Sequence, residues 1–398
     1  MRIGILTYHG VSNEGSVLQA LSLWTLLSRR FPKDEVEIID YIPWRTWSRN
    51  LKPLISPKVG LRKKLYALGK LRQLRSLLRR SGALGPRIWT SDRLGPARKA
   101  LEKAGYDTLV VGSDTVWEVR EDGFLPPPPN LFFLPDVRGV QKMGFAASSD
   151  KGRRYQPGDG RWDQLGAYLR DFDFVSVRDE ETRRMLIDCG VEADEIRMMA
   201  DPTLLSAWEG ALEHESCDDG PQAVGKKAAL WVFMPEFSRA LRNGLEERGY
   251  EVVDLTKHWT ADATGRSLFA PLRHDLWARI RSIRSQSVLF TDRFHGSILT
   301  MKTSSVPVVF VEHAERYPNS SSKGRDLFER LDLTEWIWRA PNERHLDGRE
   351  FSRVCQLLES ESLDPGFRRS ALLDLGRASE PVVEEVVERI ESARPKLA

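Results

Sequence analysis

The sequence predicts an α/β protein with two Rossmann-like domains that face a cleft, each with a parallel sheet covered by helices on both faces. Short apolar runs alternate with helical patterns, which is typical of parallel sheets buried on both faces. The pattern of strand, helix and strand occurs near the start of the chain and again after residue 226. A length of 398 residues also suits two domains better than one.

The expected elements follow one another in this order. In the first half, strands are predicted at residues 2–8, 36–41, 108–111, 142–146, 174–177 and 196–199. In the second half they are predicted at residues 228–233, 251–255, 287–290 and 306–311. Helical spacing of apolar residues occurs at 16–28, 180–188 and 239–248, between these strands.

The domain bounds follow from composition. Residues 213–226 are polar and contain glycine and proline, so they are the predicted linker. The predicted domains are an N-terminal domain at 1–212 and a C-terminal domain at 227–340, with helices at 341–398 that pack back on both.

Positive charge is concentrated in one stretch of the N-terminal domain, a predicted basic helical insertion at about 44–103. Between Trp44 and Lys103 there are 17 lysine and arginine residues, against the acidic residues Asp92 and Glu102. Within it, residues 61–80 carry eight basic residues and no acidic one, with leucines at helical spacing. This asymmetry predicts a face for an anionic partner. Interleaved stacking aromatics and a known binding module are lacking, so nucleic acid is not the expected partner.

Other features bear on location and metals. No apolar run approaches the ~18 residues of a membrane helix, and residues 1–6 have the pattern of a strand, not of a signal peptide. The three cysteines are far apart, which is typical of a reducing compartment and gives no metal spacing. The sequence therefore predicts a cytoplasmic protein without a metal site.

Small or charged residues follow many of the predicted strands, where ligands bind in open α/β sheets. Each has an ordinary alternative explanation, such as a helix cap or a turn, and a lone histidine is more often structural than catalytic. The first glycine turn also lacks the full dinucleotide fingerprint. The candidate residues are Asn13, Gly15, Gln19, Ser113, Asp114, Arg178, Arg293, His295, Ser322 and Lys323.

The order of the surrounding motifs is more informative than any single residue. The chain contains NEGSVLQA, VVGSDTVW, GFAASS, VSVRDEET, ADPTLL and TDRFHGSILT, followed by SSKGRDLFERLDL. Together, and in this order, they resemble the polysaccharide pyruvyl transferase family. One departure is Glu14, where relatives often have an aromatic residue.

The resemblance implies a fold like that of the two-domain GT-B glycosyltransferases and transfer of a pyruvyl group from phosphoenolpyruvate to sugar hydroxyls, forming a ketal. It implies that Arg178 and Arg293 bind the donor, since arginine pairs well with carboxylate and phosphate. His295 is the expected acid–base group, and Asp114 is expected to orient the acceptor hydroxyl or to act as its base. The remaining candidates are expected to bind substrate: Asn13, Gly15, Gln19, Ser113, Ser322 and Lys323.

Phosphoenolpyruvate is then a co-substrate, and no cofactor is expected. The acceptor is a glycan, a lipid-linked saccharide or a nucleotide-sugar. Residues 61–80 are expected to contact an anionic membrane at its inner face, to flank the acceptor cleft, or to form a solvated surface helix. Two other functions stay open: a GT-B glycosyltransferase that uses a nucleotide-sugar, and a non-catalytic glycan-binding relative.

Overall fold

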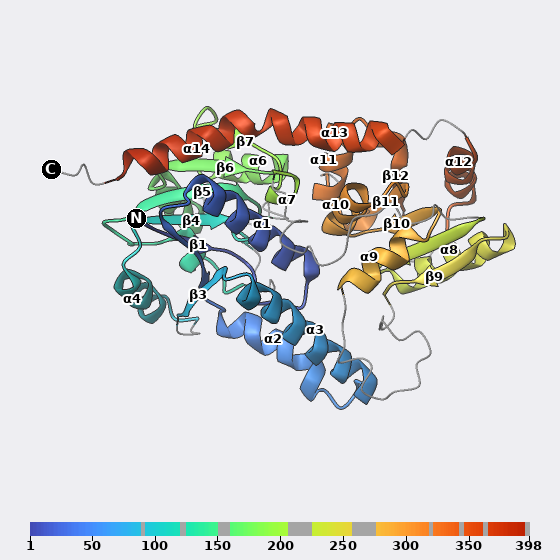
Figure 1. The fold of residues 1–398 in the computed structure, drawn as a ribbon, viewed down its shortest axis with the longest axis horizontal. Coiled ribbons are helices and arrows are strands. Elements are labelled where there is room, and N and C mark those ends of the chain that lie inside the picture. The colour runs from blue at the N-terminus through green and yellow to red at the C-terminus, as the bar shows by residue number, and fades with distance from the viewer. Residues whose placement is uncertain are drawn as a thin grey trace. The chain divides into compact units, whose positions relative to one another are not determined.

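The computed structural model describes residues 1–88, 92–119, 125–149, 160–205, 225–256, 276–317, 321–341, 346–360 and 365–394. The chain divides into two compact units, each an α/β unit (Figure 1). The first comprises Met1–Gly60, Leu71–Glu213 and Gly376–Ala398, and the second comprises Leu61–Lys70 and His214–Leu375. The predicted linker at 213–226 falls largely outside the described residues.

The first unit contains a parallel sheet of seven described strands. Its strands are β1 (Arg2–Leu6), β2 (Glu35–Asp40), β3 (Leu84–Arg87), β4 (Thr108–Gly112), β5 (Gln141–Ala147), β6 (Phe174–Val177) and β7 (Ile196–Met198). They lie in the order β3-β2-β1-β4-β5-β6-β7. At the centre, Ile5 lies opposite Ile38 on one side and Val110 on the other, and all three are fully buried. The strand order reverses between β1 and β4, the position where doubly wound folds bind ligands.

Each face of this sheet is covered by helices. Because successive side chains of a strand point to opposite faces, Leu6 and Ile5 belong to two different clusters of buried side chains. The cluster of Leu6 includes buried residues of α4 (Leu94–Ala104), α5 (Gly160–Arg170) and α6 (Glu180–Asp188). The cluster of Ile5 includes buried residues of α1 (Glu14–Arg30), α3 (Leu61–Arg80) and α14 (Glu380–Ser392).

The second unit contains a parallel sheet of five described strands. They are β8 (Lys227–Trp231), β9 (Glu251–Asp254), β10 (Val288–Thr291), β11 (Val308–His313) and β12 (Ile337–Ala340), in the order β12-β11-β10-β8-β9. Its helices are α8 (Pro235–Glu247), α9 (Leu276–Arg284), α10 (Phe294–Thr303), α11 (Lys323–Arg330) and α12 (Gly348–Glu359). Trp338 is fully buried, with its ring edge-on to Phe237 at 5.3 Å between ring centroids. These two sheets confirm the predicted α/β class.

In the described ranges, the remaining elements are α2 (Trp44–Ile55), α7 (Pro202–Leu205), α13 (Pro365–Ala378) and three short 3-10 helices at Leu131–Phe133, Ala314–Arg316 and Thr334–Trp336. Helix α14 belongs to the first unit and packs against its sheet, where Arg197 donates to Glu385 at 3.0 Å. Just before α14, Ser379 accepts a hydrogen bond of 2.8 Å from the backbone of Ala200. None of the helices in the described ranges is long and apolar enough to cross a membrane.

Candidate functional site

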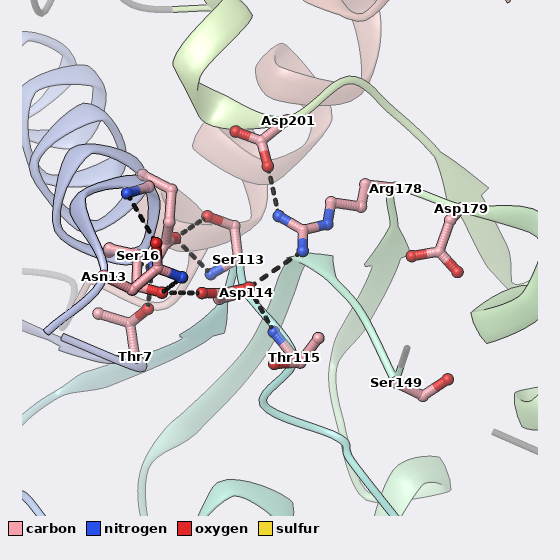
Figure 2. Close-up of polar contacts among 12 residues, drawn as sticks. Thr7, Asn13, Ser16, Ser113, Asp114, Thr115, Ser149, Arg178, Asp179 and Asp201 are labelled. Carbon is pink, nitrogen blue, oxygen red and sulfur yellow. Dashed lines mark hydrogen bonds and ion pairs between the residues drawn. The ribbon is translucent and has the colours of Figure 1, made fainter. Parts of the chain in front are cut away.

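A polar network joins the start of α1 to the loop after β4 (Figure 2). Asn13 caps α1, because its Oδ1 accepts from the backbone N–H of Gly15 at 3.2 Å. The Asn13 side chain also donates to Ser16 Oγ at 3.1 Å, and Ser16 Oγ donates to Asp114 Oδ2 at 2.6 Å. The structure thus brings the candidates Asn13, Gly15 and Asp114 together through Ser16.

Gln19 connects the same two segments one turn further along α1. It is fully buried, and its Nε2 donates to Thr7 Oγ1 at 2.9 Å. Its Oε1 accepts from the backbone N–H of Ser113 at 3.2 Å and from the Ser113 hydroxyl. These bonds occupy both ends of the amide, so in this structure Gln19 and Ser113 hold the loop after β4. Their predicted contact with substrate stays a prediction.

Arg178 follows β6 and lies inside the first unit between two carboxylates (Figure 2). Its Nη2 donates to Asp114 Oδ1 at 3.1 Å, and its Nη1 donates to Asp201 Oδ2. Burial would lower the pKa of Arg178, but Asp201, Asp114 and Asp179 outweigh it and raise the pKa above its ordinary value. Arg178 therefore stays charged, and its donor-binding role would require it to share or exchange these partners. Asp201 had the sequence pattern of an ordinary turn.

A third carboxylate lies near this pair without a hydrogen bond to it. Asp179 caps α6, where its Oδ1 accepts from the backbone N–H of Thr182 at 2.8 Å and from its hydroxyl at 2.6 Å. The Thr182 hydroxyl accepts from the backbone N–H of Ser149 at 2.8 Å, which fixes the loop after β5. The Oδ2 atom of Asp179 is buried without a hydrogen-bond partner in the described part of the chain.

In the second unit, Arg293 and His295 lie at the start of α10. Arg293 is the N-cap residue in an extended conformation, and the helix begins at Phe294, so His295 lies in the first turn of α10. The backbone N–H of Arg293 donates to Thr291 Oγ1 at 3.0 Å. The guanidinium of Arg293 lies over the ring of Phe233 at 5.0 Å from its centroid. Both Arg293 and His295 are half-buried, so part of each side chain is accessible to a ligand, whereas the Nε2 atom of His295 is buried.

The start of α11 lies close to the start of α10. Ser322 caps α11 by accepting from the backbone N–H of Arg325 at 3.1 Å, and its own N–H donates to the buried Glu312 at 3.1 Å. The ammonium of Lys323 is 5.8 Å from the centroid of the Phe294 ring. Two helix N-termini and two cations thus share one region, which we call the α10–α11 cluster: Arg293, His295, Ser322 and Lys323. Helix N-termini and cations both favour anions.

A histidine–aspartate pair lies next to this cluster, because Asp292 directly precedes Arg293 in the chain. His313, at the end of β11, lies with its Nε2 at 3.1 Å from Asp292 Oδ2, and both side chains are buried. The same Oδ2 accepts from the backbone N–H of Phe233 at 2.9 Å, so Asp292 anchors the residue over which Arg293 lies. The sequence reasoning missed Asp292, His313 and Phe233. The available signal was their position, with Asp292 and Phe233 just after strands β10 and β8 and His313 at the end of β11.

The ten candidates thus form one network in the first unit and one cluster in the second. That Arg178 and Arg293 face a common cleft stays a prediction. Among the described residues, no group of three or more histidine, cysteine, aspartate or glutamate side chains could hold a metal ion.

A sequence model of the family described as polysaccharide pyruvyl transferase matches residues 13–314, which is most of the chain. The chain belongs to the polysaccharide pyruvyl transferase family. It is thus a member of a transferase family, and the match spans the network of the first unit together with Arg293 and His295. Among curated proteins, none matches this chain in sequence.

Solved structures similar to this pyruvyl transferase family member share its fold at low sequence identity. A putative UDP-N-acetylglucosamine 2-epimerase from Listeria monocytogenes has a TM-score of 0.51 at 12% identity, covering 100% of this chain and 99% of its own. MnaA from S. aureus with UDP has a TM-score of 0.50 at 13% identity, covering 98% and 97%. HepE from Anabaena in complex with UDP has a TM-score of 0.50 at 10% identity, covering 98% and 100%. These similarities show a GT-B-like fold.

Proposed function

We propose that this protein transfers the pyruvyl group of phosphoenolpyruvate to two hydroxyls of a glycan or glycan precursor, forming a ketal and releasing phosphate. The observation that carries this proposal is the α10–α11 cluster, which places Arg293, His295 and Lys323 at two helix N-termini in a member of this family. Phosphoenolpyruvate carries a carboxylate and a phosphate on three carbons, and a compact polyanion of this kind needs several positive groups at fixed positions.

In the proposed mechanism, Arg293 pairs with one anionic group of the donor, since its planar guanidinium matches carboxylate or phosphate geometry. Phe233 keeps the guanidinium in place through a cation–π contact, and Asp292 fixes Phe233 in turn. Lys323 and the N-terminus of α11 add positive potential for the other anionic group.

The chemical step then needs a proton on the methylene carbon of the donor. His295 is the proposed acid, because an imidazole side chain can both donate and accept a proton. Protonation turns the methylene into a methyl group and leaves an oxocarbenium-like carbon at the neighbouring position. The first sugar hydroxyl attacks that carbon and loses its proton. Phosphate leaves with its bonding electrons, and the second hydroxyl closes the ketal ring and loses its proton. No cofactor enters this sequence of steps.

The first unit is the proposed place for the acceptor. Asp114 accepts hydrogen bonds from Ser16, Arg178 and the backbone of Thr115, and these fix the orientation of its carboxylate. A carboxylate in this state can accept a proton from, or orient, an acceptor hydroxyl. Asn13 and Gly15, at the N-terminus of α1, are the proposed contacts for acceptor phosphate or hydroxyl groups.

We also place this reaction in the cytoplasm. Cys189 and Cys355 are free and buried, and burial raises the pKa of the Cys189 thiol to about 12. Such thiols are suited to a reducing compartment. Peripheral contact with an anionic membrane through α3 is part of the same proposal, because the exposed leucines Leu61 and Leu68 lie among its basic residues.

The alternative of a nucleotide-sugar transferase rests on the shared fold, and fold alone does not fix function. The two activities are separated by incubating the protein with candidate glycan acceptors and either isotope-labelled phosphoenolpyruvate or isotope-labelled UDP-sugars. Mass spectrometry should find a labelled pyruvyl ketal on the acceptor and free phosphate in equal amount. Transfer of a labelled sugar, with no pyruvyl group on any acceptor, would contradict the proposal.

A further inference from the structure

We propose that a cavity in the first unit binds the apolar chain and the phosphate of a lipid phosphate held in a membrane. The cavity has a volume of about 170 Å³ and lies between the loop after β1, helix α2 and the second half of α3. Neither the family's name nor the polar network assigns a role to it.

The wall of the cavity is mainly apolar. Ile42, Trp47, Leu51, Leu71 and Leu74 line it, with Leu74 buried and Trp47, Leu51 and Leu71 half-buried. An apolar cavity of about 150 Å³ holds a benzene molecule, so this one has room for about one branched isoprenoid unit or a short stretch of alkyl chain. Its polar lining is fixed by internal bonds: Asn50 donates to the backbone oxygen of Gly10 at 2.6 Å.

An apolar path connects this cavity to the protein surface. Trp47 stacks on Trp44 at 4.9 Å between ring centroids, and 54% of Trp44 is exposed. On the same helix, Ile55 is 75% exposed. Tryptophan at the edge of an amphipathic helix is typical of the interface between lipid and water. The chain of a lipid could therefore pass from a bilayer along Trp44 into the cavity without crossing a polar layer.

The charges around the cavity point to phosphate as the head group. Helix α2 and residues 71–80 of α3 contain seven basic residues and no acidic one: Arg45, Arg49, Lys52, Arg72, Arg75, Arg79 and Arg80. Arg75 lines the cavity, and two of its N–H groups bind the buried carboxylate of Asp40, one of them at 3.2 Å. Its side chain remains 27% exposed, and a guanidinium has five N–H donors, so Arg75 can also donate to a phosphate. Exposed Arg87 also lines the cavity.

The cavity and the polar network share a loop. Val11 lines the cavity and Asn13 caps α1, and two residues of chain span at most about 7 Å. In this proposal, a sugar attached to the bound phosphate extends from the cavity toward the network of Asn13, Ser16 and Asp114. The proposed lipid site deepens the proposed function and rests on it in one respect. It takes the acceptor of pyruvyl transfer to be a glycan carried on a lipid phosphate.

The cavity is tested without any donor, by calorimetric titration of the full-length protein with geranyl phosphate, geraniol and inorganic phosphate. Geranyl phosphate should bind at least about tenfold more tightly than either control, because only it offers both the chain and the anion. Leu51→Phe, which fills the cavity, should weaken geranyl phosphate binding at least about tenfold, whereas Leu51→Ala should keep it within about threefold. Both variants should first show wild-type circular dichroism. Equal binding by Leu51→Phe and the wild type, or by geraniol and geranyl phosphate, would overturn the site.

Binding of the protein to a lipid phosphate in a membrane is measured by sedimentation with phosphatidylcholine vesicles. The vesicles contain either farnesyl phosphate or phosphatidylglycerol at matched surface charge. The wild type should prefer the farnesyl phosphate vesicles, and Trp44→Gln should reduce that binding while leaving the affinity for free geranyl phosphate unchanged. Equal binding to both kinds of vesicle would overturn the proposal in favour of general electrostatic attraction. Since no donor is present, either failure is distinct from failure of pyruvyl transfer, which is measured with phosphoenolpyruvate and acceptor.

Discussion

Arg178 carries its charge inside the first unit, where its ion pairs with Asp114 and Asp201 offset the cost of burial. Removing one partner of such a group leaves the others buried and uncompensated. We therefore expect Arg178→Ala to lower the free energy of unfolding by about 3–5 kcal/mol, as measured by urea denaturation. The matched control is Arg184→Ala on α6, whose ion pair with Glu180 is exposed and should contribute less than about 1 kcal/mol. Equal losses in the two variants would contradict the structural role of Arg178.

Asp40 provides a prediction of pH dependence. Burial alone would raise the pKa of this carboxyl, but hydrogen bonds from His9 and Arg75 outweigh burial and hold the pKa below its usual range. The unfolded chain therefore binds a proton at Asp40 near pH 4 while the folded protein does not, so stability falls as the pH falls below about 4. Asp40→Asn should show a shallower loss of unfolding free energy between about pH 4 and pH 3 than the wild type. Parallel curves for the two proteins would refute the assignment.

Phe233 is one of the residues that the structure adds to the proposed donor site. If its ring positions Arg293, Phe233→Leu should raise KM for phosphoenolpyruvate about two- to fivefold and leave kcat nearly unchanged, since an accessible cation–π contact contributes about 0.5–1 kcal/mol. Phe233→Tyr keeps an aromatic face and should restore the wild-type KM. A rise in KM that tyrosine does not rescue would show that packing, and not the contact with Arg293, is responsible.

The candidate site was only partly predictable at this scale. Residues that follow strands were found because the ends of parallel strands gather ligands, and the structure joins them into the network and the cluster. Asp201 was interpreted as an ordinary turn and His313 was missed, because their partners, Arg178 and Asp292, are distant in sequence. Nothing in the local pattern distinguishes a buried carboxylate that binds an arginine from one that begins a turn.

At the scale of elements, the central strands and the edge strands β7 and β9 were predicted, and the edge strands β3 and β12 were missed. β3 contains glycine and proline in Leu84–Arg87, a composition that is tolerated at an edge but argues against a strand in sequence. β12, Ile337–Ala340, has four residues and lies at the other sheet's edge. An edge position alone does not explain the two misses, because the edge strands β7 and β9 were predicted.

In helix α3, leucines of one periodic pattern are buried in one half of the helix and exposed in the other. The leucine stripe predicted at 61–80 is real, but Leu74 and Leu78 are buried in the core of the first unit, whereas Leu61 and Leu68 are exposed. Leu74→Ala should lower the free energy of unfolding by about 2–5 kcal/mol, and Leu68→Ala on the same helix should change it by less than about 0.5 kcal/mol, as measured by urea denaturation. Similar losses would contradict this division of the helix.

At the scale of the whole molecule, the α/β class and the use of parallel sheets followed from the alternation of apolar runs and helices, and the family from the order of its motifs. The sequence predicts C-terminal helices that pack back on the domains, but the exact bounds of the units could not be predicted in the same way. Residues 376–398 lie far from residue 1 in sequence, yet they belong to its unit, because the apolar face of α14 packs on the first sheet's cluster. Only long-range contacts contain that information.

The central claim is that the α10–α11 cluster binds phosphoenolpyruvate and that His295 moves the proton, and one experiment tests both parts. Phosphoenolpyruvate binding is measured by calorimetry, and turnover by pyruvyl transfer to the acceptor, for the wild type, Arg293→Ala and His295→Gln. Arg293→Ala should weaken donor binding about ten- to a hundredfold, because it removes a charge-assisted pair. His295→Gln should bind the donor almost normally and turn over about 100- to 10,000-fold more slowly. If a folded His295→Gln variant turns over at the wild-type rate, or Arg293→Ala binds the donor as the wild type does, the claim is wrong.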